Sequence, residues 1–151
     1  MAAEPRAITA LVVDDDDDIR YLVRALLERE GIRVVDQALD GVDALMAISR
    51  LAPPPVPTVI VLDNMMPALS GLEVAAQILR EVPDQRIILF SAHLTPDITR
   101  EAAEMGIAAC VAKSDVAKLP EIISDVARAA MTDVDLREET AGSDPGRPQQ
   151  W

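Results

Sequence analysis

Acidic and polar side chains stand where the apolar runs of this 151-residue sequence end. They follow the first, third, fourth and fifth runs and are, in that order, Asp14 with Asp15, Asp63, Ser91 and Lys113. Three carboxylates that meet in one crevice repel one another unless a cation lies among them, and hard oxygen ligands of this kind favour Mg²⁺. An acid beside Mg²⁺ could attack phosphorus and form an aspartyl phosphate. The hydroxyl and the lysine would bind the phosphoryl oxygens, so the set suffices for phosphoryl transfer.

The elements that must position these residues are five strands, each followed by a helix. The strands are predicted from apolar, β-branched runs without alternation, which indicate burial on both faces of a parallel sheet. They are Ile8–Val13, Ile32–Val35, Val59–Leu62, Ile87–Phe90 and Ile107–Val111. Strands that alternate with helices predict an α/β fold, a doubly wound parallel sheet with helices on both faces. In such folds ligands bind beyond the carboxyl ends of the strands, which is where the candidate residues lie.

The helices are predicted from apolar residues at helical spacing. The first two stripes are Ile19, Leu22, Val23, Leu26 and Leu27, and then Val42, Leu45 and Met46. The last helix should begin near Leu119, because Pro120 is tolerated only in a first turn.

Composition narrows the class of protein. The formal net charge of −12 argues against nucleic acid or an anionic membrane as a direct partner. A single cysteine excludes an internal disulfide framework and fits a reducing cytoplasm. No apolar run approaches the ~18–20 residues of a membrane span, and the start lacks the pattern of a secretory signal. We expect one domain over residues 1–131 and a disordered acidic tail over 132–151, which is rich in Gly, Pro, Gln and Ser.

Several conspicuous residues have plainer interpretations. In the acidic run Asp14–Asp18, we assign the first two residues to the site and the last three to capping the next helix. His93, the only histidine, has no partner in sequence that would make it catalytic. Cys110 lies in an apolar run and is expected to fill space in the core. Pro53–Pro57 is expected to form a stiff loop rather than a ligand motif.

Two segments carry a family resemblance. The segment Val12–Asp15 followed by Arg20, and the segment Leu62–Pro67 followed by Gly71 and Glu73, resemble the receiver domain of two-component response regulators. The resemblance implies a flavodoxin-like fold with strand order 2-1-3-4-5. Because no effector pattern follows residue 131, a receiver of the stand-alone type is expected.

The resemblance also implies roles for single residues. They are Asp63 as phosphoacceptor, Asp15 as direct Mg²⁺ ligand, Asp14 acting mainly through metal-bound water, the Met65 carbonyl as a further ligand, and Ser91 and Lys113 as phosphoryl contacts. The donor would be a phosphohistidine on a sensor histidine kinase or a histidine phosphotransfer protein. Phosphorylation would then change binding to a downstream protein. One departure concerns the output: many receivers have Tyr or Phe three residues before the lysine, where this sequence has Cys110.

Two other functions remain open at this stage. A small Mg²⁺-dependent phosphatase of the haloacid dehalogenase type would use Asp14 as nucleophile, with Asp16 two residues later. Asp18 stands where that type has Thr, and the loop after Asp63 would be unexplained. A receiver-like binding module that works without phosphorylation is the second alternative, and the complete set of acids argues against it.

Overall fold

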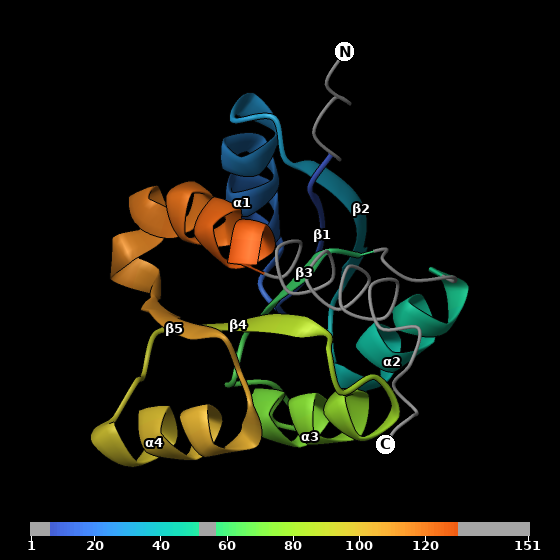
Figure 1. Cartoon of the computed structure of the whole chain (residues 1–151), viewed down its shortest axis with the longest axis vertical. Helices are drawn as coiled ribbons and strands as arrows, with labels where there is room; N and C mark the ends of the chain where they lie inside the picture. The colour runs from blue at the N-terminus through green and yellow to red at the C-terminus, as the bar shows by residue number, and fades with distance from the viewer. Residues whose placement is uncertain (1–6, 52–56, 130–151) are drawn as a thin grey trace, which may run out of the picture.

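The computed structural model describes residues 7–51 and 57–129. The predicted tail at 132–151 and all but Pro57 of the predicted loop Pro53–Pro57 lie outside these residues, and both stay predictions. The strands are β1 (Thr9–Val13), β2 (Arg33–Ala38), β3 (Val59–Leu62), β4 (Arg86–Ser91) and β5 (Ala109–Ala112). The helices are α1 (Asp17–Arg29), α2 (Gly41–Arg50), α3 (Gly71–Glu81), α4 (Pro96–Met105), the 3₁₀ helix η1 (Lys113–Lys118) and a fifth α-helix over 119–129 (Figure 1).

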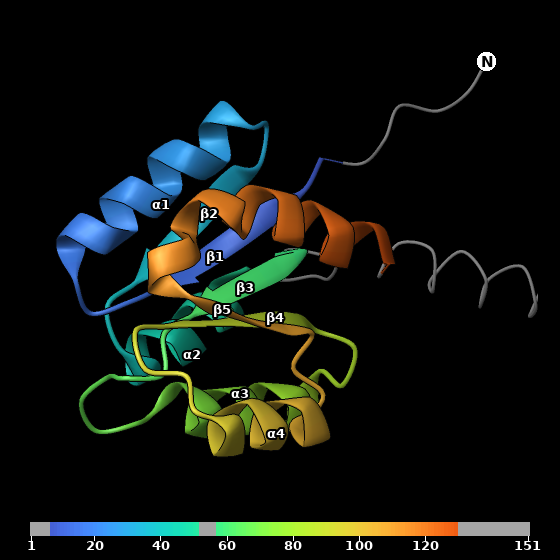
Figure 2. The ribbon, with the colours of Figure 1, turned by 90° about the vertical axis from the view of Figure 1, so that its left-hand side faces the viewer.

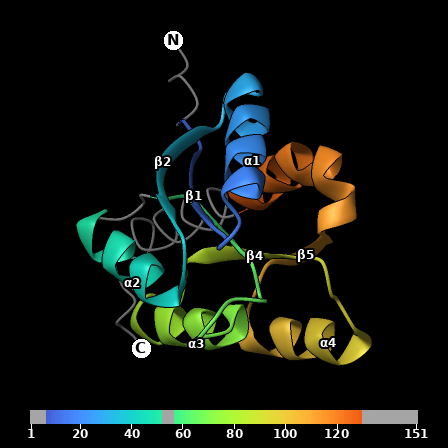
Figure 3. The same ribbon diagram turned by 180° about the vertical axis from the view of Figure 1, so that it is seen from behind.

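The strands form one parallel sheet in the order β2-β1-β3-β4-β5, which confirms the predicted fold class and strand order. Helix α1 and the fifth helix cover one face, and α3 and α4 cover the other (Figure 2). The view from behind shows α2 beside α3 at the β2 end of the sheet (Figure 3). Each face has its own apolar core, and Phe90 and Leu89 of β4 point into different ones. The sheet is therefore covered on both faces, and its carboxyl edge carries the loops that follow the strands.

The start of β5 differs from prediction because a residue expected in the strand forms a backbone hydrogen bond with the preceding helix. The prediction Ile107–Val111 is wrong at its start, because the Ile107 N–H donates to the Ala102 carbonyl and so completes the end of α4. Gly106 ends that helix with a φ of 102°, a left-handed conformation that glycine adopts without strain. Burial on both faces is also wrong for β2, whose central residues are half-buried because the strand lies at the edge of the sheet.

Helix α2 exists as predicted, but its apolar stripe is only partly buried: Leu45 packs against the core, whereas the prediction is wrong for Val42 and Met46. Val42 and Met46 are each 56% exposed, and the buried residues of the helix are small: Gly41, Ala44 and Ala47. A Cβ at Gly41 would lie 2.7 Å from the Val74 side chain, so this turn packs too closely against α3 for a larger residue. In α1, Leu22 of the predicted stripe is likewise exposed, at 43%. The fifth helix begins at residue 119, as predicted.

Among the described residues, no helix combines the length and the apolar character needed to cross a membrane.

Candidate functional site

The carboxyl ends of β1 and β3 lie side by side and bring two acids together. Val13 is paired with Leu62 in the sheet, and the Asp63 N–H donates to the Val13 carbonyl at 3.0 Å. Asp14 and Asp63 therefore leave adjacent strands at the same level. With Asp15 they form a cluster in which one carboxylate oxygen from each lies within 4.8 Å of the others. The loops after β1, β3 and β4 meet at this edge, at the left of the sheet in Figure 2.

Lys113 supplies the positive charge of the cluster. Ser91 is paired with Ala112 in the sheet, so Lys113 follows β5 at the same edge. Its Nζ lies 2.7 Å from Asp14 Oδ2 and 3.3 Å from Asp63 Oδ2. Burial lowers the pKa of Lys113, but its pairing with Asp14 and Asp63 outweighs burial, and the net pKa is raised. The side chain is therefore an ammonium ion throughout the physiological range.

Asp63 is held in a less favourable setting for its charge. Burial raises the pKa of this carboxyl, and the charge of Asp14 raises it further. A hydrogen bond from the Met65 N–H to Asp63 Oδ1, at 3.1 Å, and the charge of Lys113 act in the opposite direction. The net pKa is raised, so ionised Asp63 is stabilised less here than in water.

The cluster fits a hard cation. Asp14 is 1% exposed, and its Oδ2, although close to Lys113, has no hydrogen bond of normal geometry. Asp15 is exposed, so the cluster opens to solvent on one side. Mg²⁺ is bound in proteins by one or two carboxylates and keeps several waters, which suits a buried oxygen of this kind beside an open rim.

The other predicted residues lie at the same edge. Ser91 is fully buried at the end of β4, and its Oγ accepts a hydrogen bond from the N–H of exposed His93 at 3.3 Å. Met65 has an exposed side chain and contacts the cluster through its backbone N–H. The roles of Ser91 and of the Met65 carbonyl stay predictions. The predicted cap of α1 is confirmed for Asp16, whose side chain accepts from the N–H groups of Asp18 and Ile19, whereas Asp17 and Asp18 lie in the first turn of the helix.

Asn64, for which the sequence predicted no role, connects the loop after Asp63 to α3. Asn64 is 7% exposed; its carbonyl accepts from the Gly71 N–H and its Oδ1 from the Leu72 N–H, both at 3.0 Å. The residue next to Asp63 thus caps the first turn of α3 with both backbone and side chain. Asn64 stands one position beyond Asp63 and well ahead of α3, so no local spacing in the sequence identifies this contact.

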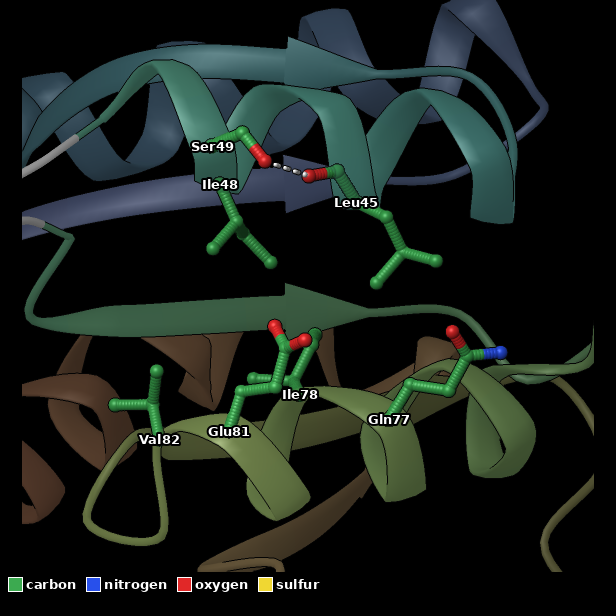
Figure 4. Close-up of a pocket in the computed structure, with 7 residues that line it drawn as sticks. All are labelled: Leu45, Ile48, Ser49, Gln77, Ile78, Glu81 and Val82. Carbon is green, nitrogen blue, oxygen red and sulfur yellow. Dashed lines mark hydrogen bonds between the residues drawn. The ribbon is translucent and has the colours of Figure 1, made fainter.

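A cavity of about 230 Å³ lies away from this edge, between α2 and α3. Figure 4 shows Leu45 and Ile48 on one side and Ile78 and Val82 on the other. Among the residues that line the cavity, Ser49 alone carries a hydroxyl group, and this hydroxyl donates to the Leu45 carbonyl at 3.2 Å. None of the predicted site residues lines it, so the acid cluster remains the candidate site.

Comparison with known proteins identifies the family. The model of the response regulator receiver domain matches residues 10–124. The chain belongs to this family. A solved relative, the signal receiver domain of the putative response regulator NarL from Mycobacterium tuberculosis, is 31% identical, with a TM-score of 0.69 over 82% of this chain and 98% of that one.

Curated relatives of this receiver domain are longer proteins. A protein-glutamate methylesterase/protein-glutamine glutaminase of Halobacterium salinarum is 37% identical over 139 residues, which are 89% of this chain and 39% of that protein. The virulence regulator BvgA of Bordetella pertussis is 31% identical over 121 residues, which are 80% of this chain and 54% of BvgA. The chain thus spans about half of BvgA and less of the methylesterase.

Proposed function

We propose that this receiver domain is the phosphoacceptor of a two-component or phosphorelay system, with Asp63 as the residue that is phosphorylated. The observation that carries the proposal is the position of Asp63. It is buried beside Asp14, lies 3.3 Å from the Lys113 ammonium, and belongs to a cluster of three acids whose oxygens come within 4.8 Å of one another.

Each residue of the cluster would have a distinct part. Asp14, Asp15, Asp63 and the Met65 carbonyl would hold Mg²⁺, which when bound supplies positive charge against the phosphoryl oxygens. The Met65 N–H fixes one oxygen of Asp63 and Lys113 faces the other, so the carboxylate is oriented before the donor arrives.

In the reaction itself, an Asp63 oxygen attacks phosphorus, the P–N bond to the partner's histidine breaks, and its electron pair returns to the imidazole. Lys113 and Ser91 would then contact the transferred phosphoryl oxygens.

The partners are proposed from chemistry. The donor would be a phosphohistidine of a sensor histidine kinase or a histidine phosphotransfer protein, in the cytoplasm, and the output a change in binding to another protein. Methylesterase and transcription regulator are the names of relatives that are only partly matched, so neither activity is assigned to this chain. Its net charge of −12 disfavours direct contact with DNA. Catalysis by the domain would be limited to its own phosphorylation and dephosphorylation.

The test is intact-mass measurement after incubation with Mg²⁺ and a small phosphodonor such as phosphoramidate. We expect the parent to gain one phosphoryl group, Asp63→Asn to gain none, and a chelator to abolish labelling. Asp115→Asn, an exposed acid of η1, is the matched control and should label like the parent. Labelling of Asp63→Asn would contradict the assignment of Asp63. Steady turnover of a phosphomonoester would favour the phosphatase with Asp14 as nucleophile, and an unlabelled parent would favour a binding module.

A further inference from the structure

Arg20 of α1 is directed toward the backbone of the site rather than into water. Its Nη1 donates to the Asp14 carbonyl at 2.6 Å, and its Nη2 donates to the Asp17 carboxylate. The Arg20 side chain is only 15% exposed, whereas its partner Asp17 is 87% exposed. Arginine side chains at a surface usually keep the guanidinium in water, so this orientation has a specific cause. That cause is the pair of acceptors at the start of α1.

The carbonyl that Arg20 binds belongs to the peptide that joins Asp14 to Asp15. The Asp14 N–H donates to the Ala38 carbonyl at 3.1 Å, and Asp14 Oδ1 accepts from the Asp16 N–H at 2.9 Å. Arg20 adds a hydrogen bond to the Asp14 carbonyl oxygen. This bond fixes the carbonyl and with it the plane of the Asp14–Asp15 peptide. Within the described part of the chain, no hydrogen bond or ion pair holds the Asp15 carboxylate, which is exposed. The direction of Asp15 therefore depends on that peptide plane.

We propose that Arg20 is a positioning residue that orients the Asp14–Asp15 pair and thereby strengthens Mg²⁺ binding. The inference rests on the proposed function for the identity of the ion. Charge alone gives the opposite sign, because a guanidinium near a cation site repels the cation and its removal would tighten binding. Groups that hold metal ligands in place usually contribute about 10- to 100-fold to metal affinity. If Arg20 acts by position, its removal weakens Mg²⁺ binding despite the loss of a positive charge.

The experiment is calorimetric titration of the full chain with Mg²⁺ at constant ionic strength. Arg20→Met keeps the aliphatic stem and removes every donor, and Arg20→Lys keeps the charge but not the fork that spans two acceptors. Arg24→Met is the matched control, one turn further along α1, where the native arginine pairs with Glu28 at 3.4 Å. We expect Arg20→Met to weaken Mg²⁺ binding about tenfold, Arg20→Lys to weaken it less, and Arg24→Met to bind like the parent.

Urea unfolding in a chelator separates positioning from simple stabilisation. A loss of stability with an unchanged Kd for Mg²⁺ would show that Arg20 only supports the helix, and would overturn the inference. Either Arg20 variant, folded and binding Mg²⁺ as tightly as the parent or more so, overturns it too. If Arg20→Met does not fold, Arg20→Lys decides. A parent that binds no Mg²⁺ refutes the metal site of the proposed function and this inference with it. A parent that binds Mg²⁺ and labels, beside variants with parental Kd, refutes this inference alone.

Discussion

Asp63 and Asp14 share the ammonium of Lys113, and this sharing decides how the site responds to a change of charge. Both carboxylates have side chains only 2% exposed, and Lys113 lies closer to Asp14 than to Asp63. Burial and the charge of Asp14 leave the pKa of Asp63 raised even though Lys113 and the Met65 N–H lower it. Asp63, the proposed phosphoacceptor, is thus an acid whose charge the fold does not fully compensate. A group that neutralises this charge should stabilise the protein.

Replacing Asp63 with Asn should raise the free energy of unfolding in a chelator at neutral pH, by roughly 0.5–2 kcal/mol. A carboxyl whose pKa is higher in the folded state binds more protons there than in the unfolded chain, so its contribution to stability falls as pH rises through the folded pKa. The gain should therefore be complete above that pKa and vanish below about pH 4, the unfolded value. Urea unfolding across pH measures it, with Asp115→Asn as control. Equal stability of parent and Asp63→Asn at neutral pH would contradict the prediction.

At the scale of elements, the β3–α3 loop, which carries Asp63, joins β3 to α3 with almost no free space. A Cβ at Gly71 would lie 2.3 Å from the Asp63 carbonyl oxygen, closer than any contact allows. The same turn receives the two hydrogen bonds of Asn64 and the capping box of Ser70 with Glu73. The loop backbone, the cap of α3 and Asp63 are therefore packed as one unit, and a change in the loop should displace the Asp63 carboxylate.

Gly71→Ala should cost about 1–3 kcal/mol of stability and slow phosphorylation of Asp63, because the new methyl group pushes against backbone that cannot rotate away. Gly31→Ala is the control. Gly31 has a φ of 83° and open space around its Cα, so alanine there meets only the left-handed backbone penalty, about 1–2 kcal/mol. Because the expected losses of stability of the two variants overlap, the rate of phosphoryl labelling is the measurement that distinguishes them. Gly31→Ala should label at the parental rate, and a Gly71→Ala protein that also does so would refute the coupling of loop and acid.

How far the sequence predicts this fold also differs by element. The strands and the meeting of Asp14, Asp63 and Lys113 at one edge were predictable, because buried parallel strands are continuous apolar runs and these polar residues stand where the runs end. The buried face of α2 was not, because it is made of Ala44 and Ala47 beside Gly41, and patterns are dominated by large residues such as Met46. The two hydrogen bonds that Asn64 accepts from the start of α3 cross the loop, and the spacing of residues in the sequence does not reveal them. Small residues and polar contacts between elements are therefore what the pattern misses.

The β4–α4 loop is the element that we expect to transmit phosphorylation. Cys110 of β5 packs against the core on the α4 side, as do Leu94 of the loop and Ile98 of α4. Burial raises the pKa of the Cys110 thiol, so this side chain is a neutral thiol that has no ring to rotate. A phosphoryl group on Asp63 could still draw the Ser91 hydroxyl toward it and displace the loop behind it.

Amide chemical shifts around Ala92–Leu94 should therefore change when a phosphoryl mimic such as beryllofluoride occupies the site, and should change equally in Cys110→Ala. The measurement compares two-dimensional spectra of both proteins with and without the mimic, and amides of α1 away from the site serve as internal reference. If the shifts at Ala92–Leu94 disappear in Cys110→Ala while the mimic still binds Asp63, Cys110 is itself the switch and the prediction is wrong.

At the scale of the whole molecule, the proposed metal site would link Mg²⁺ binding to folding. Asp14 and Asp63 leave strands that are far apart in sequence, and only the native sheet brings their oxygens within 4.8 Å of each other. The unfolded chain, although it carries a net charge of −12, offers no such cluster. An ion that binds the folded state alone shifts the folding equilibrium by mass action.

Mg²⁺ at 100 times its Kd should therefore raise the free energy of unfolding by about 2.7 kcal/mol. Thermal or urea unfolding with and without Mg²⁺ measures the gain, at matched ionic strength so that screening of the acidic surface is equal in both. Asp15→Ala should lose most of the gain, since it removes an exposed oxygen ligand without touching the core. Asp18→Ala is the matched control: it removes an acid of the same run, one that lies in the first turn of α1 and outside the cluster, and should keep the gain. A gain that survives Asp15→Ala, or that Asp18→Ala loses equally, would show that Mg²⁺ acts on the general negative charge of the surface and not through this cluster.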